Sequence, residues 1–388
     1  SSTKASSGSS TSWEATPGRS YTLEGTSSLR EPWKSTGVYL AATNRLEFRL
    51  PMGAQARFFR ITQSLPAATP RPYQSAPTGY AYDPRFANYY QNWTEVPERV
   101  LSINRQLRDR GLLEELASVA PIADPRSYIA KTHTASHIQG IQSIPIDRAN
   151  GATEAYGVVA DLAVAYILGA VRDVCENKIR NAYCNIRPPG HHQINSGVSY
   201  GYCGYANVVI AARFALERYP DLIKRVMIID WDYHHGNGTE HFVRDDPAFL
   251  FYDTCAGGFY LGGDERRHGF MNFSSGNEGF VKEWDNEMMP LARAFKPDLV
   301  LISAGFDSKK KDLMGGEGVT ARGFSILTRK VMDIAEEFSG GRVVSILEGG
   351  YADSGSADPA TYHGLMECLE NHVRTLMTGE LQDETPFY

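Results

Sequence analysis

The sequence has no long hydrophobic run, few cysteines and no excess of positive charge. None of its apolar segments reaches the roughly 18 residues that a membrane span needs, so we expect no spanning helix. The formal net charge is −6 and the basic run at 309–311 is short, which argues against a nucleic-acid-binding surface. Five cysteines without CxxC spacing give no disulfide framework. The composition is that of an ordinary enzyme.

One apolar, β-branched run ends directly in side chains that can bind metal, within the stretch 228–239 (IIDWDYHHGNGT). Alternate residues of a strand point to the same side, so Asp232 and His234 share one direction and can bind one ion. A carboxylate and a neutral imidazole suit zinc, and a catalytic zinc site needs a third protein ligand and an open position for water. A surface turn with scattered polar residues is the alternative, but these groups are costly there unless they are paired or bind metal.

Three further predicted strands end in similar positions. They lead into His191 and His192, into Asp307, and into the EGGY motif at 348–351. In open α/β sheets, ligands gather outside the carboxyl ends of the strands. We therefore expect the four strand ends to converge, with Asp307 as the natural third metal ligand.

Five motifs follow one another in the second part of the chain. They are RPPGHH at 187–192, YGYC at 200–203, DWDYHHGNGT at 230–239, SAGFDS at 303–308 and EGGY at 348–351. In order and spacing this set resembles the histone deacetylase and acetylpolyamine amidohydrolase family, with weaker similarity beginning near residue 79. Asn237, where class I enzymes have Asp, makes the chain more similar to class II deacetylases and their bacterial relatives.

The resemblance implies a zinc-dependent amidohydrolase that removes an acetyl or similar acyl group from an acylated primary amine. The implied zinc ligands are Asp232, His234 and Asp307. The implied catalytic residues are His191, His192, Tyr351, Asp230 and Asn237. Zinc would polarise the amide carbonyl and lower the pKa of a bound water.

Each implied catalytic residue has a distinct role. His192 is the general base that later protonates the leaving amine, whereas His191 is chiefly electrostatic. The implied hydrogen-bond partner of His191 is Asp230, and that of His192 is Asn237. The amide partner leaves His192 less basic than a carboxylate would. Tyr351 points its hydroxyl at the carbonyl oxygen and stabilises the oxyanion.

A substrate tunnel is also implied, lined by Gly201, Tyr202, Tyr260, Met314 and Gly349. The two tyrosines replace the phenylalanines usual in the family, so the tunnel is narrower or more polar. Met314 stands where the eukaryotic polyamine deacetylase has Glu, which argues against a cationic substrate. Acetyl-lysine peptides, acetylpolyamines and small acylated amines stay open as substrates. The alternatives are an acetylpolyamine amidohydrolase and, less favoured, a non-catalytic binding protein on the same fold.

Two residues depart from the family near a structural monovalent-cation site. Asp253 replaces a Ser that helps to bind this ion, and Cys255 replaces a His. A potassium ion is therefore a second candidate cofactor. Two outcomes are open: the potassium site is lost, or the carboxylate has taken over part of it.

The chain divides by composition into four parts. We expect a flexible linker at 1–12, a small β-sandwich-like module at 13–65, a Pro/Ala/Thr linker at 66–78 and a deacetylase-like catalytic domain at 79–388. Short strands are expected at 20–23, 37–42, 45–50 and 57–62, and helices at 98–116, 152–176, 205–218, 284–295 and 323–338. Strands that alternate with helices predict a three-layer α/β/α domain with a largely parallel sheet. The resemblance identifies it as the arginase-like deacetylase fold.

The expected partners are an acylated amine substrate, with no nucleic acid and no membrane span. Assembly into a homo-oligomer stays open. The pieces WEATPGRSYTLEGTSSL at 13–29 and ARFFRI at 56–61 resemble small fibronectin-III-like modules of proteins secreted by environmental bacteria. We therefore expect a secreted or periplasmic location, with the cytoplasm as the alternative.

Overall fold

The computed structural model describes most of the second part of the chain with its side chains, at residues 76–91, 93–255, 276–355 and 362–383. It describes the backbone alone at residues 10–14, 20–26, 34–40, 45–49, 58–64, 256 and 268–271. Two compact units result, Ser1–Arg71 and Pro72–Tyr388.

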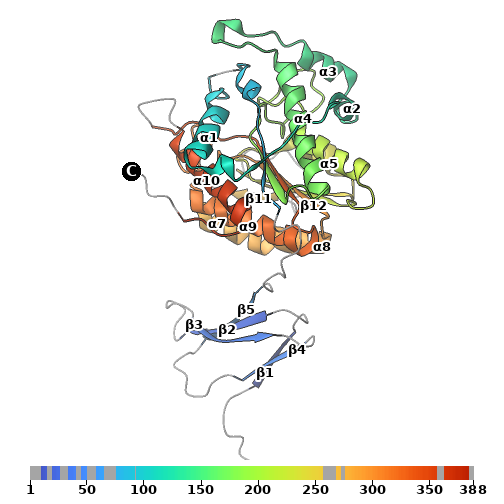
Figure 1. Cartoon of the computed structure of the whole chain (residues 1–388). Coiled ribbons are helices and arrows are strands. Elements are labelled where there is room, and N and C mark those ends of the chain that lie inside the picture. The colour runs from blue at the N-terminus through green and yellow to red at the C-terminus, as the bar shows by residue number, and fades with distance from the viewer. Residues whose placement is uncertain are drawn as a thin grey trace, which may run out of the picture. The chain divides into compact units, whose positions relative to one another are not determined.

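The first unit contains five antiparallel strands in two sheets (Figure 1). In one sheet β1 (Ser10–Glu14) pairs with β4 (Arg45–Arg49). In the other, β2 (Ser20–Thr26) lies between β3 (Lys34–Leu40) and β5 (Phe58–Ser64). Strands β2 to β5 overlap the four expected strands, whereas β1 begins inside the segment expected as a linker. The β-sandwich arrangement stays a prediction.

The second unit is built on an eight-stranded sheet in which all neighbouring strands are parallel, in the order β11-β10-β9-β12-β13-β8-β6-β7. The strands are β6 (Gly79–Ala81), β7 (Ala117–Ser118), β8 (Asn181–Cys184), β9 (Val226–Asp230), β10 (Phe249–Ala256), β11 (His268–Met271), β12 (Leu299–Ala304) and β13 (Val343–Leu347). The predicted α/β class with a parallel sheet is confirmed.

Helices cover both faces of this sheet (Figure 1). They are α1 (Glu98–Asp109), α2 (Arg126–Ile129), α3 (Ala135–Gln142), α4 (Tyr156–Cys175), α5 (Asn207–Arg218), α6 (Asn237–Val243), α7 (Gly276–Glu283), α8 (Met289–Phe295), α9 (Ala321–Phe338) and α10 (His363–Thr378). A π-helical turn, Trp284–Met288, joins α7 to α8. The expected helix 98–116 ends at Asp109, because Gly111 adopts a left-handed conformation with φ 72°.

The central strands explain why the site forms where it does. Every residue of β9 and β12 is buried, as expected for parallel strands covered on both faces. Asp230 at the end of β9 is in register with Ser303 of β12 and Asp253 of β10. Strands β9, β12, β13 and β8 are neighbours in that order, so the four strand ends singled out by the sequence lie side by side.

Candidate metal-dependent active site

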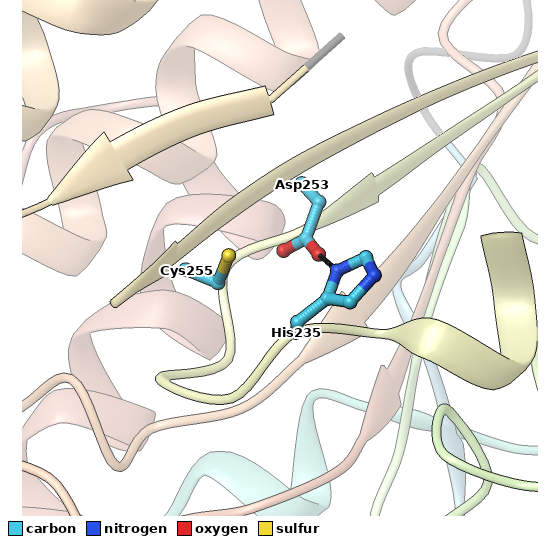
Figure 2. A group of neighbouring side chains, drawn as sticks. All are labelled: His235, Asp253 and Cys255. Atoms are coloured by element: carbon cyan, nitrogen blue, oxygen red, sulfur yellow. Dashed lines mark hydrogen bonds and ion pairs between the residues drawn. The ribbon is translucent and has the colours of Figure 1, made fainter. Parts of the chain in front are cut away.

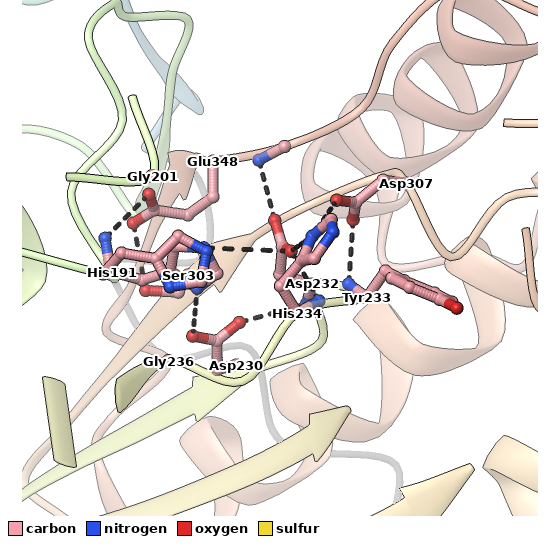
Figure 3. Close-up of polar contacts among 12 residues, drawn as sticks. His191, Gly201, Asp230, Asp232, Tyr233, His234, Gly236, Ser303, Asp307 and Glu348 are labelled. Carbon is pink, nitrogen blue, oxygen red and sulfur yellow. Dashed lines mark hydrogen bonds and ion pairs between the residues drawn. The ribbon is translucent and has the colours of Figure 1, made fainter. Parts of the chain in front are cut away.

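Three residues form a possible metal site at the carboxyl edge of the sheet (Figure 3). Asp232 and His234 lie in the loop between β9 and α6, and Asp307 follows β12. Each offers one ligand atom, and these atoms lie within 4.8 Å of one another. Nδ1 of His234 is 3.2 Å from a carboxylate oxygen of Asp232 and 3.0 Å from one of Asp307. Two carboxylates and one imidazole fit a zinc ion with an open coordination position.

Backbone groups fix both carboxylates. The amide of Gly349 donates to Asp232 at 2.8 Å, and the amide of Tyr233 donates to Asp307 at 2.8 Å. Glycine is needed where the backbone comes close to these carboxylates, because a Cβ at Gly305 would lie 2.0 Å from an oxygen of Asp232. A Cβ at Gly349 would lie 2.4 Å from an oxygen of Asp307. The glycines of the SAGFDS and EGGY motifs therefore give the ligands their space.

The two neighbouring histidines have different hydrogen-bond partners. Nδ1 of His191 lies 3.0 Å from Asp230, and Nδ1 of His192 lies 2.8 Å from the amide oxygen of Asn237. An amide oxygen can only accept, so Nδ1 of His192 carries the proton and Nε2 is left as the base. Burial opposes the charge of His191, but Asp232 and Asp230 raise its pKa well above the usual value. Burial and the charge of His191 lower the pKa of His192 to about 3.

Glu348 is a buried residue of the site to which the sequence assigned no role. Its carboxylate accepts hydrogen bonds from the backbone amides of Gly190 at 2.6 Å and His191 at 3.1 Å, and from the Ser303 hydroxyl at 3.2 Å. These contacts join the histidine loop to the ends of β12 and β13. Burial raises the pKa of Glu348, opposed by the charge of His191.

A buried ion-pair network supports Tyr351, and the sequence did not reveal it. The Arg99 guanidinium carbon lies 4.8 Å from the centre of the Tyr351 ring. The same group donates to the carbonyls of Gly350, at 2.7 Å, and Glu348. Glu95 pairs with Arg99 at 3.0 Å and with Arg187 at 2.6 Å, and all three side chains are fully buried. Arg187 lies in the RPPGHH motif, but the sequence assigned no role to Arg187, Glu95 or Arg99.

A cavity of about 180 Å³ opens onto the site. Its lining residues are Pro189, His191, His192, Gly201, Tyr202, His234, Met314, Gly349 and Tyr351. The expected tunnel residues are thus brought together, apart from Tyr260, which lies outside the described residues. The Tyr202 hydroxyl accepts a hydrogen bond from Thr94 at 3.2 Å, so its added polar group has a partner.

Comparison with known proteins identifies the family. The histone deacetylase domain matches residues 93–365, so the chain belongs to the histone deacetylase family. "Histone deacetylase 5" of Arabidopsis thaliana is 31% identical over 66% of this chain and 43% of its own length. Mouse "Polyamine deacetylase HDAC10" is 30% identical over 75% of this chain and 45% of its own length. The chain therefore spans less than half the length of these two relatives.

Two further proteins are similar to this chain. A "Probable deacetylase" of Archaeoglobus fulgidus is 28% identical over 75% of this chain and 86% of the relative. The crystal structure of the "HDA15 HD domain" has a TM-score of 0.67 at 23% identity, covering 80% of this chain and 92% of that one. The second match shows that the fold is shared. No helix among the described residues has both the length and the apolar character of a membrane span.

Proposed function

We propose that the chain is a zinc-dependent amidohydrolase that removes an acetyl or similar acyl group from an acylated primary amine such as acetyl-lysine. The proposal rests on one observation: the candidate metal ligands, a cavity, and a candidate base and oxyanion donor lie together. The clustered ligands Asp232, His234 and Asp307 lie beside a cavity that is lined by His192 and Tyr351. This combination supports hydrolysis of an amide rather than binding alone.

The residues divide the chemistry among themselves. Zinc held by the three ligands would supply a Lewis acid for the carbonyl and a water of lowered pKa. Nε2 of His192 takes the proton of the attacking water and returns it to the leaving amine. Asn237 holds His192 in the required tautomer, and Asp230 orients His191 beside the developing charge. The Tyr351 hydroxyl donates to the oxyanion, an interaction stronger in the transition state than in the substrate.

The cavity and its surroundings favour a substrate without a distal positive charge. Its described lining includes no acidic side chain, and Met314 lies in the wall. Two exposed apolar side chains are next in sequence to lining residues: Tyr200 is 50% exposed and Leu313 41%. Such a rim suits an acyl-lysine peptide or a neutral acylamine, whereas a polyamine ammonium needs a charge partner.

A substrate panel tests the proposal. We expect kcat/KM for an acetyl-lysine peptide or a neutral acetylated alkylamine to equal or exceed kcat/KM for acetylputrescine and acetylspermidine. A clear preference for the acetylpolyamines would place the chain with polyamine deacetylases. Full zinc loading without turnover of any acylated amine would make it a binding protein.

A further inference from the structure

A second buried group of metal-binding side chains lies next to the active site (Figure 2). It consists of His235, Asp253 and Cys255, whose ligand atoms lie within 4.8 Å of one another. Asp253 and Cys255 are alternate residues of β10 and therefore point to the same side of the sheet. His235 comes from the loop after β9 and meets them there. The group thus brings together one imidazole, one carboxylate and one thiol.

The two ring nitrogens of His235 have the kinds of neighbour that a metal-bound histidine has. Its Nδ1 contacts the carboxylate of Asp253, and its Nε2 lies 3.0 Å from a carboxylate oxygen of Glu240 on α6. The backbone amide of Gly236 donates to Asp253 at 3.0 Å. Metal-ligating histidines commonly donate their other ring nitrogen to a carboxylate, which fixes the ring and its tautomer. Glu240 is in the right place for this role.

Two further buried acidic side chains lie near this group, Glu240 and Glu317. Glu317 is fully buried, and neither of its carboxylate oxygens has a hydrogen-bond partner. Asp253 and Glu317 are also both close enough for their charges to act on Cys255. Buried charges of one sign are costly unless a cation compensates them.

The donor atoms indicate which kind of ion fits. Potassium, magnesium and calcium prefer oxygen ligands, whereas a thiol and an imidazole suit zinc and similar borderline ions. We propose that Nδ1 of His235, the carboxylate of Asp253 and Sγ of Cys255 form a second divalent-metal site of the zinc class. This site lies where the family resemblance implies a monovalent cation. It does not depend on the proposed amidohydrolase activity.

The second ion would have a structural effect on the catalytic loop. His235 directly follows His234, and Asp253 is in register with Asp230, whose carboxylate contacts His191. A metal at this site would tie the β9–α6 loop, which carries two catalytic ligands, to the neighbouring strand β10. Without metal, a protonated His235 that donates from Nδ1 to Asp253 and from Nε2 to Glu240 would hold the same loop, and this is the competing explanation.

Cobalt substitution of the full chain distinguishes the two explanations. Co²⁺ bound to a thiolate gives an intense charge-transfer absorption in the near ultraviolet, and the catalytic ligands include no sulfur. We expect the metal-depleted wild type to bind two equivalents of Co²⁺ and to show this absorption. Asp307→Ala should keep the absorption and lose one equivalent, whereas Cys255→Ser should lose both the absorption and one equivalent.

Matched controls make the result specific. Cys368→Ser, which replaces another buried cysteine, on α10, should bind two equivalents and keep the absorption. Asp253→Ser gives a second test that leaves Cys255 intact, and it should weaken the absorption at least tenfold at limiting Co²⁺. One equivalent and no charge-transfer absorption in the wild type would overturn the proposal in favour of the protonated histidine. An absorption that survives in Cys255→Ser would also overturn it.

Discussion

Tyr351 is held in place before any substrate enters. Its ring lies over the Arg99 guanidinium, and its backbone amide donates to Asp312 at 2.9 Å. Burial raises the pKa of its hydroxyl well above the usual value, opposed by the charge of Arg99. The hydroxyl therefore stays protonated and able to donate to an oxyanion at neutral pH.

Removing this hydroxyl should affect turnover and little else. We expect Tyr351→Phe to lower kcat by about 10²-fold or more, as for the loss of one oxyanion donor. Zinc content and unfolding temperature should stay close to those of the wild type, because the ring and its contacts are kept. Steady-state kinetics with an acetyl-lysine peptide measure the effect, and a near-normal kcat would rule out the role given to Tyr351.

We expect the hydrogen-bond partner of His192, Asn237, to set the pH range of the reaction. A carboxylate in Asn237→Asp would stabilise the protonated imidazole and raise the pKa of His192. The base must be unprotonated to act, so activity should be lost at a higher pH on the acidic side. In Asn237→Asp, we expect the acidic limb of the pH profile of kcat/KM to shift to higher pH by about one unit or more. An unchanged limb at equal zinc content would show that His192 is not the base.

The sequence singled out the residues that the structure brings together at the site, but not the residues that support them. Asp232, His234 and Asp307 were recognisable because metal ligands at strand ends form a pattern. Arg99 and Glu95 were not, since a buried ion pair looks like an ordinary pair of surface charges in the sequence. The role of Arg99 and Glu95 depends on the loops that pack against them, and only the tertiary structure shows which loops these are.

At the scale of elements, the four strands that end at the site were predictable and their order was not. Continuous β-branched runs identify buried parallel strands, because both faces must be apolar. The order of β9, β12, β13 and β8 in the sheet depends on the crossover helices and on side-chain packing across the sheet. Family resemblance supplied the fold, and the local pattern alone would have left several orders open.

One buried histidine links three elements and makes stability depend on pH. His372 on α10 bonds to Thr328 of α9 at 2.7 Å and to Ser345 of β13 at 2.8 Å. Burial lowers its pKa from 6.5 to about 3. Because the folded pKa is the lower one, its neutral form stabilises the fold above about pH 6.5, and this contribution is lost as the pH falls towards 3.

A matched variant isolates this contribution. We expect the free energy of unfolding of the wild type to fall more steeply between pH 7 and pH 5 than that of His372→Gln, by on the order of 1 kcal/mol. Urea denaturation of both proteins at the same zinc concentration measures the difference, since the pH dependence of metal binding then cancels. Equal slopes would show that His372 does not control this pH dependence.

At the scale of the whole molecule, the chain divides into two compact units. The family match at 93–365 and all the assigned site residues lie in the unit Pro72–Tyr388. We propose that the strands of the first unit serve attachment or localisation. Deletion of residues 1–65 should therefore leave a folded deacetylase with kcat/KM within about twofold of the full chain. Loss of solubility or activity would show instead that the first unit packs on the second or shapes its entrance.

Paired zinc and turnover assays on the wild type and Asp307→Ala test the central claim most directly. The acetate released from an acetyl-lysine peptide is measured for each protein, together with its zinc content. We predict turnover in the zinc-loaded wild type that chelation abolishes and zinc restores, and neither turnover nor catalytic zinc in Asp307→Ala. Full zinc occupancy in Asp307→Ala, or a zinc-loaded wild type that releases no acetate, would contradict the account.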